Sequence, residues 1–229
     1  MVDTLSTKQP VYFRVPPLES GDRLSRHEFE RRYAATPEKF KAELIEGVVY
    51  VAAALRFRSH GQPHSSIMGW LVVYAAETPG VAVGDNSTVR LDLDNEPQPD
   101  AVLIIESSGQ AQISEDDYIE GAPELVVEIA ASSASIDLHD KKRAYRRNGV
   151  KEYIVWRVLD HTIDWFYLQD GEYVSLNPDE NGIIQSITFP GLWLAVSELL
   201  AGNLQAVLAV LQQGINSTEH AALIEHLKS

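Results

Sequence analysis

The chain has 229 residues, of which 45% are hydrophobic and 23% charged, a balance typical of folded globular proteins that excludes wholesale disorder. It contains no cysteine, which excludes disulfides, thiolate catalysis and cysteine-based zinc or iron–sulfur sites. Its 33 acidic residues outnumber its 19 Lys and Arg and give a formal net charge of −14, which argues against broad, non-specific attraction to nucleic acid.

The first 20 residues are predicted to form an extended N-terminal arm, because Pro10, Pro16 and Pro17 disfavour a helix. This polar segment does not resemble a secretion signal, and no later apolar run approaches the roughly 20 residues that cross a bilayer. We therefore expect a cytoplasmic protein with no membrane partner. Residues 21–212 are expected to form a single domain and residues 213–229 a short tail.

Helices and strands alternate along the predicted domain. Ser25 and Glu28 have the spacing of a capping box, so a helix is predicted from there to a point before Pro37. The next predicted elements are a strand over 48–51 with a turn or bulge at Gly47, a helix over 65–77, and strands over 81–83 and 89–93.

Two continuous apolar runs follow, over 101–105 and 125–130, and such runs are typical of central strands buried on both faces. A helix is predicted over 136–148, with Gly149 as its left-handed C-cap. The remaining predicted elements are strands over 153–157, 162–169, 172–176 and 183–188, and a helix over 196–211. The pattern predicts one α/β domain with a mixed sheet.

Several common catalytic motifs are missing from the sequence. There is no G-x-S-x-G elbow, phosphate-binding P-loop or G-x-G-x-x-G fingerprint, so serine acyl transfer, P-loop chemistry and dinucleotide binding lose their usual support. His60 and His64 are four residues apart, but Gly61 and Pro63 intervene. We therefore predict two ordinary loop histidines and no helical metal pair.

Two carboxylates occur where apolar residues are expected. Asp100 opens one apolar strand and Glu128 lies inside another, and a buried carboxylate needs a partner or a cation. If the two strands are neighbours, the carboxylates can converge on one divalent cation, and oxygen ligands suit Mg²⁺ or Mn²⁺. Alternatively, Asp100 bonds local amides, and Glu128 points to water from an edge strand or pairs with a helix arginine.

The segments around these carboxylates resemble the Uma-two family of the PD-(D/E)XK nuclease superfamily. The matching segments are Pro99-Asp100, Gly121-Ala-Pro123-Glu-Leu-Val-Val-Glu128-Ile, Asp137-Leu-His-Asp-Lys141-Lys-Arg-Ala-Tyr145 and Asn148–Val155, with family-like positions also at 43–47 and 62–64. The resemblance spans roughly residues 25–200. It implies an α/β (α+β) restriction-endonuclease-like core, with a mixed sheet flanked by helices, and a Mg²⁺- or Mn²⁺-dependent DNA endonuclease.

The resemblance also implies roles for individual residues. Asp100 and Glu128 are expected to bind the metal, with the Ile129 carbonyl as a third ligand. The superfamily lysine, two residues after the second acid, is replaced here by Ala130, and the Uma-two pattern instead puts the lysine at Lys141 on the following helix. That lysine is expected to orient or deprotonate the attacking water, or to stabilise the developing charge.

Further residues are candidates for the site and for DNA contact. Glu43 is the expected fourth member of the site, and His64 lies either near the phosphate or merely in a loop. A basic stretch could contact DNA phosphates or stabilise the helix dipole, and these readings carry equal weight. Its members are Lys142, Arg143, Arg146 and Arg147.

Three functions remain open at this stage. They are a DNA endonuclease, a relative of the same fold that binds nucleic acid or protein without cutting, and a hydrolase of smaller phosphoesters, which the net charge disfavours. The aromatic residues of the later strands are expected in the core or in a homodimer contact rather than as base-stacking platforms. These residues are Trp156, Trp165, Phe166 and Tyr167.

Overall fold

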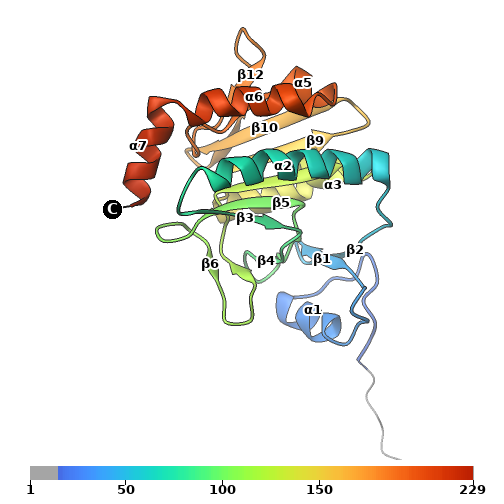
Figure 1. Cartoon of the computed structure of the whole chain (residues 1–229). Helices are drawn as coiled ribbons and strands as arrows, with labels where there is room; N and C mark the ends of the chain where they lie inside the picture. The colour runs from blue at the N-terminus through green and yellow to red at the C-terminus, as the bar shows by residue number, and fades with distance from the viewer. Residues whose placement is uncertain (1–14, 229) are drawn as a thin grey trace, which may run out of the picture.

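A mixed six-stranded sheet forms the centre of the computed structural model, which describes residues 15–228 (Figure 1). Its strands, from edge to edge, are β11 (Glu172–Leu176), β10 (Thr162–Gln169), β9 (Glu152–Arg157), β8 (Leu125–Ala130), β5 (Ala101–Ile105) and β3 (Val81–Asp85). Only β8 and β9 run parallel to each other, and every other neighbouring pair is antiparallel. Residues 1–14 of the predicted N-terminal arm lie outside the described part.

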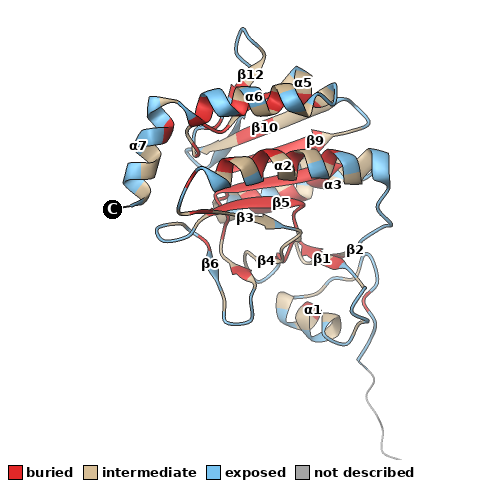
Figure 2. Cartoon of the chain, in the orientation of Figure 1, coloured by how far each residue is buried: buried red, intermediate tan, exposed pale blue. Residues whose placement is uncertain are grey.

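Helices cover both faces of this sheet. On one face, α2 (Gln62–Ala76), α5 (Val196–Leu200) and α6 (Leu204–Ile215) bury apolar residues against strand residues such as Val127 and Ile129. On the other face lie α3 (Ala134–Ile136), the π-helical turn η2 (Asp137–Lys141) and α4 (Lys142–Asn148), which packs against Val126 and Tyr153. The central strands are therefore buried on both sides (Figure 2).

The alternation of side chains along β8 decides the surroundings of its acidic residue. Successive residues of a strand point to opposite faces. Val127 and Ile129 face α2, whereas Val126 and Ala130 lie in the core cluster on the α4 side. Glu128 therefore faces the η2 and α4 side of the sheet.

Smaller elements surround the central sheet. They are α1 (Arg26–Tyr33), the hairpin of β1 (Ala42–Ile45) and β2 (Val48–Val51), the three-stranded sheet of β4 (Val89–Arg90), β7 (Ile119–Glu120) and β6 (Gln112–Ile113), the pair β12 (Ile183–Gln185) and β13 (Trp193–Ala195), and α7 (Thr218–Leu227). The hairpin packs against α1 in a small core of its own. It lies at the end of the central sheet near which α2 begins (Figure 1).

The predicted fold class is confirmed, and five strands have the predicted limits: β2, β5, β8, β10 and β11. Gly149 caps α4 with a φ of 86°, as predicted. The turn expected at Gly47 is confirmed: Glu46 and Gly47 both adopt positive φ and turn the chain back, so that β2 pairs with β1 in a hairpin. The strand expected over 89–93 is wrong beyond Arg90, where a tight turn begins.

The C-terminal third also departs from prediction in two places. The helix expected over 196–211 divides into α5 and α6, because Gly202 takes a left-handed φ of 76°. The segment expected as a tail contains α7, whose His220 is buried and lies 2.9 Å from the Thr78 hydroxyl. Among residues 15–228, no helix is both long and apolar enough to cross a membrane.

Candidate active site

Two acidic residues lie opposite each other at one end of the boundary between β5 and β8. These strands are antiparallel with Ala101 opposite Val127, and the same register continued by one residue sets Asp100 opposite Glu128. Directly opposed side chains share a face of the sheet with Cβ atoms about 5 Å apart. The Ile129 N–H also donates a 2.7 Å hydrogen bond to Asp100 Oδ2. The expected adjacency of the two strands is confirmed.

A lysine from the neighbouring helix reaches Glu128. The Nζ atom of Lys141, at the end of η2, lies 2.9 Å from Glu128 Oε1 and 2.8 Å from Glu43 Oε1. The Tyr145 hydroxyl donates a 2.8 Å hydrogen bond to the same Glu128 oxygen. Because Glu128 and Lys141 are only 4% and 5% exposed, this contact is a buried ion pair and not a surface one. Two alternatives for Glu128, an edge-strand position and an arginine partner, are therefore excluded.

The hairpin supplies the third member of the group. Glu43 lies on β1, outside the central sheet, and its Oε1 accepts a 2.6 Å hydrogen bond from the Gln98 N–H. This bond fixes the carboxylate between the segment that leads into β5 and the ammonium of Lys141. Glu43 therefore lies next to Lys141, and its role in the site stays a prediction.

Asp137 is a member of the group that sequence reasoning missed. Its side chain is 2% exposed, with Oδ1 3.9 Å from Lys141 Nζ. Its Oδ2 is buried and has no hydrogen-bond partner among the described residues. Burial raises the pKa of Asp137 to about 6. The available signal was its spacing from Lys141, because residues four apart share one side of a helix.

The prediction that His60 and His64 are loop residues is wrong. The π-helical turn η1 (Phe57–Gly61) runs directly into α2, and Gly61 itself has helical angles, φ −59° and ψ −40°. Pro63 is the second residue of α2, which begins directly after the π-helical turn. The two histidines therefore lie on a continuous helical segment.

Both histidines contact the strand that carries Asp100. The Nε2 atom of His60 lies 2.9 Å from Asp100 Oδ1, and the Nε2 atom of His64 lies 3.0 Å from the Asp100 backbone oxygen. His64 also lies 3.0 Å from Asp85 Oδ1. The bond to Asp100 raises the pKa of His60, although burial opposes this. The sequence indicated no functional role for His60, yet His60 contacts one oxygen of the Asp100 carboxylate.

The site gathers more negative charge than positive charge. Three carboxylates surround one ammonium, those of Glu43, Glu128 and Asp137 around Lys141, and the Asp100 carboxylate lies opposite Glu128. Burial raises the pKa of Glu128 well above its usual range, and the neighbouring carboxylates add to this while Lys141 opposes it. Burial favours a neutral Lys141, but three carboxylates outweigh that effect and raise its pKa well above the usual value. Lys141 is therefore a permanently charged group at neutral pH.

The chemistry of this donor set fits a hard divalent cation. The carboxylates at Lys141 outnumber its single ammonium, and the Oδ2 atom of Asp137 is a buried oxygen with no hydrogen-bond partner among residues 15–228. Carboxylate oxygens are the ligands that such cations prefer. The Ile129 carbonyl lies along the same strand edge as its N–H, toward Asp100. Within residues 15–228, however, no three His, Asp or Glu side chains are arranged around one point as metal ligands. The ammonium of Lys141 lies between Glu43 and Glu128.

The basic residues of α4 are all engaged by other groups. The ammonium of Lys142 lies 3.3 Å from the centre of the Phe166 ring. The arginines bind carboxylates: Arg143 binds Glu46 and Asp140, Arg146 binds Glu172, and Arg147 binds Glu46 and Asp92. These partners neutralise the stretch that the sequence suggested for DNA phosphates, so that role stays a prediction.

The aromatic residues of the later strands are mostly interior. A core position is confirmed for Trp156, Trp165 and Phe166, which are 7%, 1% and 7% exposed, whereas Tyr167 is half-buried. Their burial removes the observation on which a homodimer contact was based. The homodimer itself stays a prediction.

Comparison with known proteins adds a family and a fold. The model of the Uma2 family, described as "Putative restriction endonuclease", matches residues 26–197. Among solved structures, the chain is similar to one from Anabaena variabilis ATCC 29413, described as "a putative nuclease belonging to DUF820". The two share 15% identity with a TM-score of 0.58, over 75% of this chain and 96% of that one, a likeness that concerns the fold alone. No curated protein matches the chain.

Proposed function

The chain belongs to the Uma2 family, the restriction-endonuclease family whose model matches residues 26–197, and from this premise we propose that it is a DNA endonuclease that uses Mg²⁺ or Mn²⁺. The observation that carries the proposal is the buried group of carboxylates around Lys141 at the end of β8. Buried charge in excess of its partners costs folding free energy, so a structural role alone does not account for it.

The metal ligands in this proposal are the carboxylates of Asp100 and Glu128 and the carbonyl of Ile129. A divalent cation held by them supplies a water of lowered pKa and neutralises a phosphate oxygen. The chain holds Asp100 ready, because the Ile129 N–H binds one of its oxygens and His60 the other. Such outer contacts orient a ligating carboxylate and restrict its rotation.

Lys141 is proposed as the group that stabilises charge on the phosphate. Its raised pKa keeps Nζ protonated at neutral pH, which favours hydrogen-bond donation to a phosphate oxygen over removal of a proton from water. Glu43 and Asp137 hold the ammonium in place from the other side. They are positioning residues here, with Glu43 also a candidate ligand of a metal or of its water.

The test is the nicking of supercoiled plasmid DNA by purified protein with Mg²⁺, with Mn²⁺ and with EDTA. We expect nicking with either cation and none with EDTA. Asp100→Asn and Glu128→Gln should reduce it about 100-fold or more, because each removes a charged ligand. The matched control is Glu124→Gln, which alters a fully buried carboxylate outside the site.

Two outcomes would contradict the proposal. Activity that survives in Glu128→Gln would reject the assigned ligands. A wild-type protein that binds DNA but cuts none of its forms with any divalent cation would instead be a nucleic-acid-binding relative without catalysis.

A further inference from the structure

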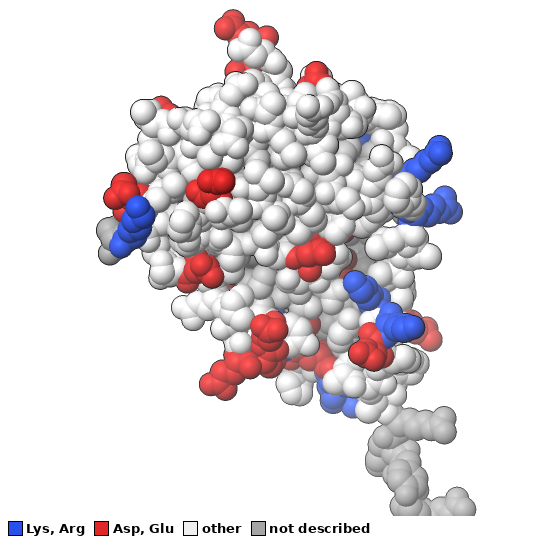
Figure 3. All heavy atoms as spheres, in the orientation of Figure 1, with Lys and Arg blue, Asp and Glu red and all other residues white. Residues whose placement is uncertain are grey.

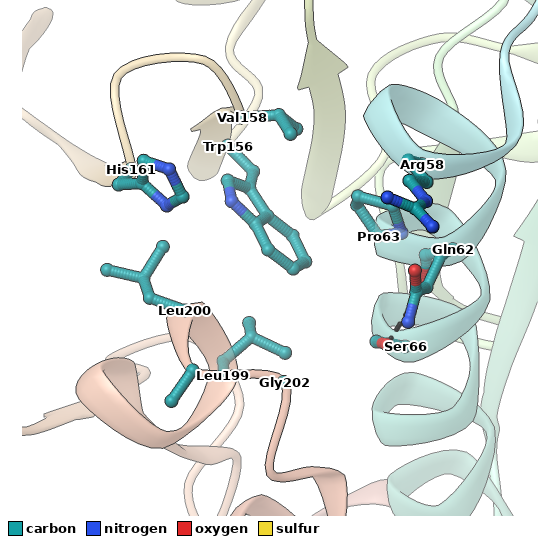
Figure 4. Close-up of a pocket in the computed structure, with 11 residues that line it drawn as sticks. Arg58, Gln62, Pro63, Ser66, Trp156, Val158, His161, Leu199, Leu200 and Gly202 are labelled. Atoms are coloured by element: carbon teal, nitrogen blue, oxygen red, sulfur yellow. Dashed lines mark hydrogen bonds between the residues drawn. The ribbon is translucent and has the colours of Figure 1, made fainter.

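A cavity of about 210 Å³ lies between α2 and β9, near the candidate active site (Figure 4). Its walls come from η1 and α2 on one side, and from β9, the turn after it and α5 on the other. Figure 4 shows the Trp156 indole projecting between His161 and the pair Arg58 and Gln62. The cavity therefore has an aromatic centre and polar groups on both sides.

The lining combines an apolar floor with a polar rim. The floor includes Trp156 and Leu199, which are 7% and 2% exposed. The rim presents the Gln62 amide and the His161 imidazole. Although the chain carries a net charge of −14, no Asp or Glu from residues 15–228 lines this cavity.

Among the described residues, Arg58 is the only Lys or Arg that lines the cavity. Its guanidinium has no hydrogen bond or ion pair with any residue from 15 to 228, and the same holds for Arg56. This separates them from the arginines of α4, each of which binds a carboxylate. Figure 3 shows basic side chains standing out along the side of the molecule on which α2 begins. These arginines are thus available to an anion.

The cavity is a direct neighbour of the active-site residues. In the parallel pairing of β8 and β9, Trp156 is the partner of Ile129, whose N–H binds Asp100. On the helical side, His60 lies between Arg58 and Gln62 in sequence and reaches Asp100. The cavity and the carboxylates thus lie at the same end of β8 and β9, with the cavity on the α2 face of the sheet and Glu128 on the α4 face.

We propose that the cavity binds one unstacked nucleotide of the DNA strand, next to the phosphate that is cut, and this inference rests on the proposed nuclease function. The base would contact Trp156 and the apolar floor, and its edge would bond to Gln62 or His161. Its phosphate would meet Arg58. An aromatic surface beside unpaired basic groups is the arrangement with which proteins bind single strands.

Exposed apolar side chains next to the cavity support a macromolecular ligand. Phe57 and Leu55 are 75% and 65% exposed and alternate with the two unpaired arginines. Clustered apolar groups on a surface commonly mark an interaction site. A free mononucleotide would leave these side chains without a partner, whereas a strand entering the cavity would cover them.

The test measures binding of a labelled single-stranded DNA dodecamer by fluorescence anisotropy in EDTA, so that no cutting occurs. Ser66→Leu fills the cavity, and Ser65→Leu is its matched control. Both hydroxyls bind the carbonyl four residues earlier, but only Ser66 lines the cavity. We expect Ser66→Leu to weaken binding about tenfold and Ser65→Leu less than twofold.

A second pair of variants tests the contribution of the Arg58 charge to binding. Arg58→Gln and Arg56→Gln remove the same unpaired guanidinium two residues apart, and only Arg58 lines the cavity. We expect Arg58→Gln to lower the affinity about fivefold more than Arg56→Gln. A mononucleotide, dAMP, serves as competitor and should displace the dodecamer only at far higher concentration.

Several results would overturn the proposal: equal losses within each pair, no DNA binding by the wild type, or dAMP binding as tight as that of the dodecamer. Failure of the nuclease function is distinguishable, because this binding is read without cutting. If the paired variants differ and DNA is never cut, the nucleotide site stands and the hydrolysis fails. If plasmid is cut and the paired variants do not differ, the nuclease function stands and the nucleotide site is rejected.

Discussion

The two ends of β8 both bury carboxylates, but different groups surround them. At its beginning, Glu124 is fully buried and accepts hydrogen bonds from the Ile105 and Gln110 N–H groups at 3.0 and 2.8 Å, with Lys151 at 3.6 Å. Glu152, at the start of the adjacent β9, accepts hydrogen bonds from four neutral donors, the nearest at 2.6 Å. These carboxylates hold backbone segments together.

At the far end, Glu128 belongs to the group around Lys141, and Asp100 lies opposite it. Neutral backbone donors are few there, and the carboxylates depend on one shared cation. A carboxylate saturated by N–H groups stabilises the fold, whereas a cluster short of positive charge is strained until a cation or substrate arrives. The same residue type thus serves structure at one end and, in our proposal, chemistry at the other.

The largest effect is expected from removing the shared cation. Lys141→Met leaves several buried carboxylates uncompensated and should lower the free energy of unfolding by about 3 kcal/mol or more. Lys142→Met is the control, since the Lys142 ammonium lies outside the cluster over Phe166. Urea denaturation of both variants in EDTA measures the difference. Equal stabilities would show that the cluster does not depend on Lys141.

The second prediction sets the two ends of β8 against each other. Glu124→Gln should lower the free energy of unfolding by about 1–3 kcal/mol, because the amide cannot accept both backbone N–H bonds. Glu128→Gln should change it by less than about 1 kcal/mol, since it removes negative charge from an overcharged group.

Calorimetry measures the stability of both variants, and plasmid nicking measures their activity. Glu124→Gln is expected to keep its activity while it is folded, and Glu128→Gln to keep its fold and lose its activity. If Glu128→Gln is the less stable variant, the division into structural and functional carboxylates is wrong.

Another buried carboxylate, that of Glu96, is expected to make the stability of the protein depend on pH. Burial, together with the neighbouring Glu30, raises the pKa of Glu96 from 4.5 to about 8. A carboxyl with a raised folded-state pKa contributes stability that is present below pH 4.5 and is lost as the pH rises through 8. Glu96→Gln should therefore be more stable than the wild type at pH 9, on the order of 2 kcal/mol. Urea denaturation at pH 5 and pH 9 measures this, and parallel curves would contradict it.

The smallest effect is expected on α4. Arg143 is 53% exposed and shares Glu46 with Arg147, so Arg143→Gln should cost less than about 0.5 kcal/mol. Its effect on DNA affinity should also be smaller than that of Arg58→Gln, because its charge is already neutralised. Anisotropy with the same dodecamer decides this. If Arg143→Gln loses more DNA affinity than Arg58→Gln, α4 is the DNA-binding element.

Part of the candidate site could be predicted from the sequence because its signals are local. An acidic residue inside an apolar run stands out at Glu128, and Asp100 follows a proline at a strand start. Period and composition along a few residues are sufficient for such features. Asp137 was within reach by the same reasoning, since it precedes Lys141 by one helical turn. Lys141 was identified only through the family resemblance.

The sequence by itself determined the mixed sheet, its central strands and the two carboxylates set among apolar residues, because each depends on neighbours in the chain. Only the tertiary structure decided that His60 meets Asp100, 40 residues away, and that the arginines of α4 are neutralised by Glu46 and Asp92. It also decided that Arg58 stays unpaired beside a cavity. Ion pairs and cavities form between distant segments, and no local pattern specifies which charges will meet.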